Sequence, residues 1–141
     1  MGDCKRIIRE IWNKVLARPC DSDTKVFFLK LLGDYYRYIC ENVTGSRLNE
    51  YKQRAVECYQ AADQIKTELG ACDPSRLGLA LNYSLFLLDW MHDKETAIRH
   101  TREALEAAYG SFDTIHENNF KEARLIIMQL EENLAEWGGD D

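Results

Sequence analysis

Residues 24–43 read TKVFFLKLLGDYYRYICENV and carry apolar side chains around most of a helical circumference. The stretch contains no proline, and Gly45 follows it as a stop signal. Ser22 or Asp23 can cap its amino end. A helix that is apolar on nearly all sides must be covered on nearly all sides. These residues therefore predict a long helix at the centre of an all-α fold.

Five further amphipathic stretches accompany this helix. Apolar residues at three- and four-residue spacing predict helices at 6–18, 47–69, 74–90, 94–109 and 118–137. Asp73-Pro74 opens the fourth of the six helices and Asp93 caps the fifth. Connections this short place neighbouring helices antiparallel. The sequence thus predicts an antiparallel array of about six helices in a single domain over 1–141, with 138–141 as a frayed acidic tail.

Composition and motif content exclude several functional classes. Hydrophobic residues make up 45% and charged residues 30% of the chain, as in ordinary globular proteins. The net charge of −6 has the wrong sign for a nucleic-acid surface. The five cysteines form no CxxC pair, and no catalytic or metal-binding motif is present. We therefore expect no catalytic residue, no cofactor, no metal and no membrane segment, and a reducing, cytoplasmic environment.

The helix at 24–43 carries one stripe of charge on its otherwise apolar surface. Four residues recur at intervals of four, three and four, within about 60° of arc: Lys30, Asp34, Arg37 and Glu41. Tyr38 lies at the edge of this stripe. A guanidinium, an ammonium and a phenol hydroxyl in a concave groove suit a phosphate, with the two carboxylates orienting the cations. The alternative is a solvated face held by intrahelical ion pairs.

Two later helices carry amides among apolar residues. Asn82 stands alone in a long apolar run, and Gln129, Asn133 and Glu136 share one face of the last helix. Trp137 lies one turn after Asn133. An asparagine can donate to and accept from a peptide backbone, which allows it to hold an extended ligand. The alternative for Asn82 is a packing amide that hydrogen-bonds within the core.

Three separated motifs resemble the 14-3-3 family, in the order in which that family has them. Residues 25–38 (KVFFLKLLGDYYRY) resemble the signature of its central helix, and residues 76–84 (RLGLALNYS) resemble its second signature. Leu125-Ile126, Asn133-Leu134 and Trp137 are similar to its last helix. The resemblance begins inside the fourth family helix and covers nearly the whole chain, so it implies a 14-3-3 protein truncated at the amino terminus.

The resemblance implies an adaptor that binds phosphoserine or phosphothreonine segments of partner proteins. The residues assigned on this basis are Arg37, Tyr38 and Lys30 for the phosphate, Asn82 and Asn133 for the peptide backbone, Leu81, Leu85, Asp89, Gln129 and Trp137 for the groove lining, and Asp34 and Glu41 for orientation. The family's pocket also uses a lysine and an arginine from a helix without a counterpart here, which implies weakened binding. Gln129 and Glu136 replace apolar residues of the usual groove wall.

Partners and an alternative function follow from the first two helices. Family dimers form through helices without a counterpart here, so the resemblance implies exposed apolar residues that another copy can cover: Ile7, Ile11, Val15, Phe27 and Leu31. Residues 29–36 (LKLLGDYY) also fit the opening of a tetratricopeptide repeat. The later positions of that repeat do not fit and no second copy occurs. A tetratricopeptide-like scaffold without phosphate dependence is therefore the alternative function.

Overall fold

The computed structural model describes residues 6–7, 9–10, 13, 21–111 and 117–138. Its elements in these ranges are the helices α2 (Ser22–Cys40), α3 (Gly45–Ile65), α4 (Pro74–Asp89), α5 (Lys94–Tyr109) and α6 (Glu117–Glu136), and a 3₁₀ turn, η1 (Lys66–Glu68). The prediction of an all-α fold is confirmed over these ranges. The first expected helix, at 6–18, and the end of the acidic tail lie largely outside the described residues.

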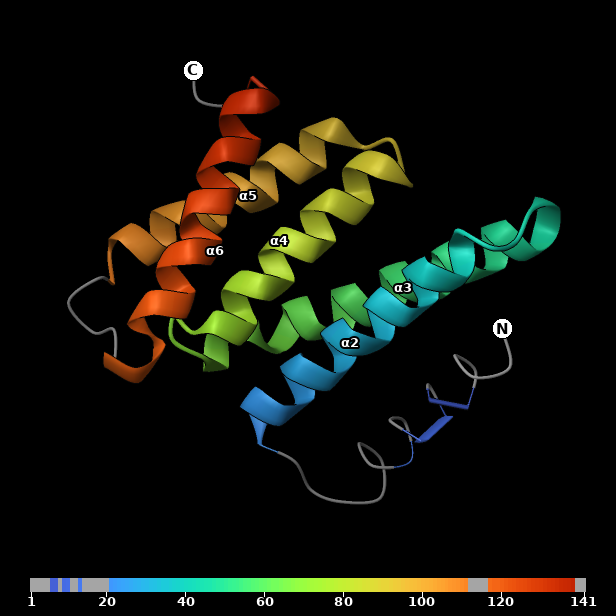
Figure 1. Ribbon diagram of the computed structural model, residues 1–141, viewed down its shortest axis with the longest axis horizontal. Coiled ribbons are helices and arrows are strands. Elements are labelled where there is room, and N and C mark those ends of the chain that lie inside the picture. Colours follow the sequence, from blue (N-terminus) through green and yellow to red (C-terminus); the bar gives the residue numbers. More distant parts are fainter. Residues whose placement is uncertain (1–5, 8, 11–12, 14–20, 112–116, 139–141) are drawn as a thin grey trace. The chain divides into compact units, whose positions relative to one another are not determined.

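The contacts divide the chain into two compact units, which we describe separately: unit 1 is Met1–Glu68 and unit 2 is Leu69–Asp141. In unit 1, α2 and α3 run side by side as an antiparallel hairpin (Figure 1). In unit 2, α4 packs against both α5 and α6, which also contact each other (Figure 1). The antiparallel packing was expected from the short connections, whereas a single domain over 1–141 stays a prediction.

The boundaries of α2 differ from those predicted. Asp21, rather than Ser22 or Asp23, is the N-cap, and its Oδ1 accepts a hydrogen bond from the Thr24 amide at 2.9 Å. The helix ends at Cys40: the Glu41 amide still donates to the Arg37 carbonyl four residues back, whereas the Asn42 amide donates to the Ile39 carbonyl only three residues back, at 2.9 Å. Gly45 does not terminate α2. It is the first residue of α3 and has a φ of +66°, which a side chain would strain.

The caps predicted in unit 2 are confirmed. Asp73 Oδ1 accepts from the Ser75 amide at 2.8 Å, with Pro74 as the first helical residue. Asp93 Oδ1 accepts from the Thr96 amide at 3.1 Å, and its Oδ2 accepts from the Thr96 hydroxyl at 2.7 Å. These aspartates satisfy amides at the helix start that have no partner within the helix. As a result α5 spans Lys94–Tyr109, as the sequence predicted.

The core of unit 1 depends on a close approach between Gly33 and Tyr59. Tyr59 on α3 is fully buried, and its ring lies directly against Gly33 on α2. A Cβ added at Gly33 would lie 2.6 Å from Tyr59 Cε1, closer than any normal contact. The thiols of Cys40 and Cys58 are buried in the same unit, as expected for cysteines that serve packing.

One edge of α2 is exposed in the described part of unit 1, as the resemblance implied for Phe27, although the apolar composition of α2 predicted a helix covered on nearly all sides. Phe27 is 48% exposed, and its ring packs edge-on against Phe28 with centroids 5.4 Å apart. Leu31 and Ile7 are half-buried, whereas Ile11 lies outside the described residues. Val15 also lies outside them. The described part of unit 1 thus supplies one helix, α3, to cover an apolar surface that extends around most of α2.

Unit 2 has its own hydrophobic core. Its buried cluster consists of Cys72, Leu77, Leu105, Ala108, Ala123, Ile127 and Leu130. Two buried hydroxyls meet between α4 and α5. The Thr101 hydroxyl lies 3.1 Å from the Ser84 hydroxyl and 2.9 Å from the Ala97 carbonyl oxygen, and it can donate to either of them. Buried polar groups paired in this way avoid the cost of desolvation. Each unit therefore positions its candidate site residues on a packed helical scaffold.

Candidate functional site

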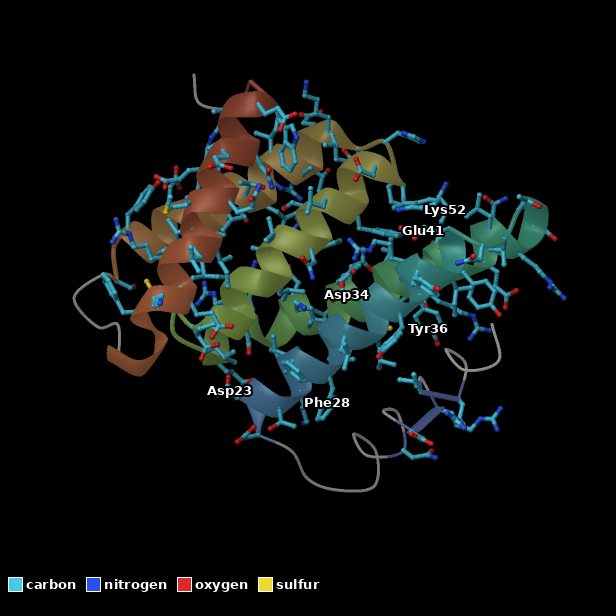
Figure 2. All side chains as sticks on the ribbon, viewed as in Figure 1. Asp23, Phe28, Asp34, Tyr36, Glu41 and Lys52 are labelled. Carbon is cyan, nitrogen blue, oxygen red and sulfur yellow. The ribbon has the colours of Figure 1, made fainter. Side chains whose placement is uncertain are left out.

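Asp34 connects the two helices of unit 1. It lies near the middle of α2, on a different side of that helix from Tyr36 (Figure 2). Its Oδ2 accepts from Lys30 Nζ at 3.0 Å, and its Oδ1 accepts from the Tyr59 hydroxyl at 2.5 Å. The Lys30 and Asp34 side chains are only 21% and 19% exposed. Both oxygens of this carboxylate are thus engaged inside the hairpin, and the ammonium of Lys30 is neutralised.

Tyr59 remains a hydrogen-bond donor throughout the physiological pH range. Burial of the ring raises the pKa of the Tyr59 hydroxyl most, and the negative charge of Asp34 and its hydrogen bond raise it further. The positive charge of Arg37 acts in the opposite direction on this pKa. Tyr59 is 25 residues from Asp34, so no local sequence signal indicates this contact.

Arg37 differs from the other cation of the stripe. Its side chain is half-buried, and no carboxylate of the described residues forms an ion pair with it. Tyr38, the next residue, is 54% exposed. Glu41 is exposed at the end of α2 (Figure 2) and is not paired with Arg37 in the described part of the chain. The structure therefore pairs Asp34 with the Lys30 ammonium, whereas Glu41 forms no ion pair with a cation of the described residues.

Asn133 is a buried polar residue of unit 2. It is 5% exposed, and its Oδ1 accepts from Gln129 Nε2 at 3.0 Å. Its Nδ2 is buried, and nothing in the described residues accepts a hydrogen bond from it. An unsatisfied buried donor costs about 1–3 kcal/mol. Trp137, one turn later, is 8% exposed. The Gln129–Asn133 pair has the four-residue spacing of side chains that meet on a helix, which is a usable sequence signal.

The remaining candidates lie on α4. Asn82 and Leu85 are half-buried, and Asp89 is exposed at the last residue of the helix. Leu81 packs against the hydrophobic core of unit 2. Asn82 has a polar or electrostatic partner in the structure, so the packing interpretation of this amide remains open.

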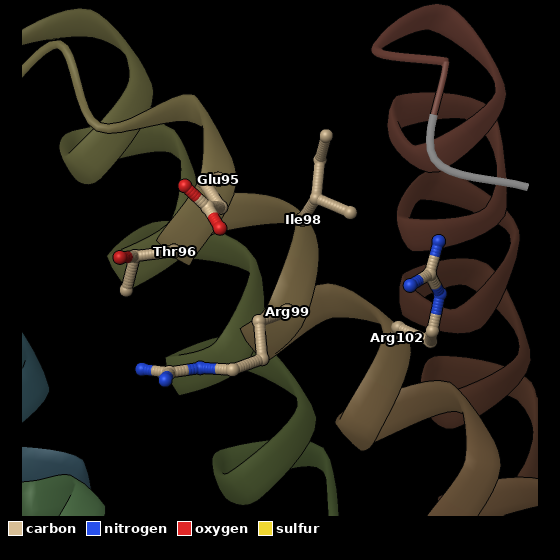
Figure 3. Close-up of a pocket in the computed structure, with 5 residues that line it drawn as sticks. All are labelled: Glu95, Thr96, Ile98, Arg99 and Arg102. Atoms are coloured by element: carbon tan, nitrogen blue, oxygen red, sulfur yellow. The ribbon is translucent and has the colours of Figure 1, made fainter.

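A hollow on α5 of unit 2 does not form an anion site. It has a volume of about 340 Å³ and is lined by Glu95, Thr96, Ile98, Arg99 and Arg102. The side chains of Arg99 and Arg102 point in different directions (Figure 3), so they do not converge on one ligand. Within the described residues, no group of three acidic, histidine or cysteine side chains could hold a metal. The helices found there also lack the length and hydropathy needed to cross a bilayer.

Comparison with known proteins gives the same family as the sequence motifs. The chain matches the model of the 14-3-3 protein family over residues 2–138. It is 35% identical to 14-3-3 protein 5 of Solanum lycopersicum and 36% identical to 14-3-3-like protein C of Nicotiana tabacum. It is also 36% identical to the 14-3-3 protein of Eimeria tenella. Each alignment covers 97% of this chain but only 54%, 53% and 50% of the respective relative. The chain thus spans about half the length of the curated relatives it matches, and the match disfavours the tetratricopeptide interpretation.

Proposed function

Because the chain belongs to the 14-3-3 family, whose members are non-enzymatic adaptors, we propose that it binds phosphoserine or phosphothreonine segments of partner proteins. The proposal concerns residues 1–141, which span about half the length of the relatives. It assigns the phosphate to α2 of unit 1 and the peptide backbone to the asparagines of unit 2.

The state of Arg37 is the observation that carries this proposal. Arg37 is half-buried and has no ion-pair partner in the described residues, so its burial is not offset by a paired carboxylate there. A phosphate dianion supplies a counter-charge and accepts two parallel hydrogen bonds from the guanidinium. Tyr38, the next residue, is 54% exposed, and we assign its hydroxyl as a further donor to the phosphate. Asp34 forms no ion pair with Arg37 in the described residues, and its two oxygens accept hydrogen bonds from Lys30 and Tyr59.

Lys30 has a secondary role in the proposed site. Its ammonium already pairs with Asp34 at 3.0 Å, so it contributes little net positive charge to a ligand. One unpaired guanidinium and one phenol hydroxyl form a modest phosphate site. We therefore expect phosphate-dependent but weak binding by this chain.

The backbone of the bound segment is assigned to Asn82 and Asn133. The buried Nδ2 of Asn133 needs an acceptor, and a peptide carbonyl is one. Such contacts hold an extended chain without reading its side chains. The contact with the phosphate would then make binding depend on phosphorylation, and the contacts with the two amides would require the bound peptide to be extended.

A fluorescence-anisotropy titration with one phosphoserine peptide and its unphosphorylated twin tests the proposal. We expect only the phosphorylated peptide to bind. Arg37→Ala should weaken binding about tenfold or more, because hydrogen bonds to charged groups contribute about 1.5–3 kcal/mol. Arg47→Ala is the matched control, since it removes the same charge from an exposed position on α3 and should leave the affinity within about twofold.

Two results would contradict the proposed function. One is equal affinity for the two peptides, which would indicate binding without phosphate dependence. The other is no binding of either peptide at high protein concentration.

A third result would contradict the assignment of the phosphate to Arg37. Equal losses of affinity in Arg37→Ala and Arg47→Ala would show that the stripe on α2 acts only through net charge, and not as a phosphate site.

A further inference from the structure

Tyr59 reaches the charged stripe of α2 from the neighbouring helix. The residue is fully buried on α3, and its hydroxyl donates to Asp34 Oδ1 at 2.5 Å. Its ring lies against Gly33, where an added Cβ would come within 2.6 Å of Cε1. The ring and the hydroxyl are thus fixed at two adjacent positions of α2, and Tyr59 can hold the Asp34 carboxylate in one place.

The bond between Tyr59 and Asp34 is of a strong kind. A phenol that donates to an ionised carboxylate at 2.5 Å lies at the short end of charge-assisted hydrogen bonds. Burial, and then the charge of Asp34, raise the pKa of the Tyr59 hydroxyl, so it keeps its proton throughout the physiological range. Only 19% of the Asp34 side chain is exposed, so water would replace this donor poorly. A carboxylate that lost the tyrosine hydroxyl would therefore need another donor.

Asp34 lies between two cations of α2. Lys30 is four residues before it, about 6 Å away along the helix axis, and pairs with its Oδ2 at 3.0 Å. Arg37 is three residues after it, about 4.5 Å along the axis in the opposite direction, and forms no ion pair with a carboxylate of the described residues. Aspartate and arginine at this spacing can pair on a helix surface. Arg37 is therefore the donor to which Asp34 can turn when the tyrosine hydroxyl is removed.

We propose that Tyr59 is a positioning residue of the phosphate site: its hydroxyl holds Asp34 away from Arg37 and keeps the guanidinium available for the phosphate. The inference rests on the proposed function, which assigns the phosphate to Arg37. Tyr59 itself contacts no ligand, because it is fully buried. Its contribution is that Arg37 does not have to break an ion pair with Asp34 before a phosphate binds.

The substitution Tyr59→Phe tests this role with little change to the core, because the buried ring stays and only the hydroxyl is removed. We expect the affinity for the phosphoserine peptide to fall about two- to fivefold, since an ion pair of Asp34 with Arg37 must then be broken. Tyr51→Phe is the matched control. Tyr51 is a half-buried tyrosine of the same helix whose ring centroid lies 6.1 Å from that of Tyr36, and its substitution should leave the affinity unchanged.

An Asp34→Asn background separates positioning from a general effect on the hairpin. Asparagine carries no charge, so it cannot form an ion pair with Arg37 whether or not Tyr59 donates to it. Asp34→Asn by itself should bind the phosphopeptide as tightly as the wild type or more tightly, and adding Tyr59→Phe should then leave the affinity unchanged. Looser packing of the hairpin would instead weaken binding by the same factor in both backgrounds. Circular dichroism of each variant checks that the folded protein is titrated.

Three outcomes would overturn the inference while phosphate dependence remains. One is an unchanged affinity of Tyr59→Phe. Another is an equal loss of affinity from Tyr59→Phe in the wild-type and Asp34→Asn backgrounds. The third is a loss in Asp34→Asn as large as that in Arg37→Ala, which would show that the carboxylate assists the phosphate contact, and this result does not depend on the folding of Tyr59→Phe. If the wild-type chain binds no phosphopeptide, the proposed function and the inference fail together.

Discussion

Replacing Gly33 with alanine tests the packing on which the α2–α3 hairpin depends. The new Cβ would lie 2.6 Å from Tyr59 Cε1, 2.7 Å from Cζ and 2.9 Å from Cδ1. Tyr59 is fully buried, and its hydroxyl is held by Asp34 at 2.5 Å, so the ring cannot move without breaking that bond. The methyl group must therefore separate the two helices or displace the ring.

The size of the effect follows from opposing contributions. Overpacking a core costs about 1–3 kcal/mol. Loss of the Tyr59–Asp34 hydrogen bond adds about 1.5–3 kcal/mol, because its acceptor is a carboxylate. Alanine is favoured over glycine within a helix by about 1 kcal/mol, which offsets part of this cost. We expect Gly33→Ala to lower the free energy of unfolding by about 1.5–5 kcal/mol.

Urea denaturation followed by far-UV circular dichroism measures this change. Gly70→Ala is the control, because nothing lies within 4 Å of a Cβ at Gly70. It should be neutral or slightly stabilising. In a Tyr59→Leu background the atoms that clash are gone, and Gly33→Ala should then stabilise the protein through its helix propensity. Unchanged or increased stability of Gly33→Ala in the wild-type background would refute the argument.

Two further predictions concern pH. Partial burial and a hydrogen bond to Glu131 raise the pKa of Tyr109 to about 12. An unfolded tyrosine ionises at about pH 10, so the contribution of Tyr109 to the free energy of unfolding is present below pH 10 and is lost as the pH rises through 12. Tyr109→Phe should remove an absorbance change at 295 nm near pH 12 and flatten this loss, and an unchanged titration would contradict the assignment. The hydroxyl and amide of Thr96 hold the pKa of Asp93 below its usual value, so the stabilisation by this cap is present above about pH 4 and lost as the pH falls through the lowered pKa. Asp93→Asn should lower the urea midpoint at neutral pH, and its difference from the wild-type protein should shrink in acid, whereas a pH-independent difference from the wild type would contradict this reasoning.

The candidate site was only partly predictable from the sequence. The Lys30–Asp34 pair follows from its four-residue spacing, and the family motifs select Arg37 and Asn133. The pattern does not indicate that Asp34 is engaged by Tyr59 across the hairpin, which leaves Arg37 without a described ion-pair partner. A stripe of alternating charge is the same in sequence whether its cations are paired or free.

Sequence alone determined the helices that start with strong local signals. Asp73-Pro74 and Asp93 fix the starts of α4 and α5, because a capping carboxylate needs only amides two or three residues away. The tertiary structure decided where the helices end, which residues pack closely and which polar groups lack a hydrogen-bond partner. The end of α2, the close approach of Gly33 and Tyr59, and the orphaned Nδ2 of Asn133 all depend on residues brought together by packing. Burial and partner choice are properties of that packing, since the same side chain can be hydrated, paired or unsatisfied without any change in its neighbours along the chain.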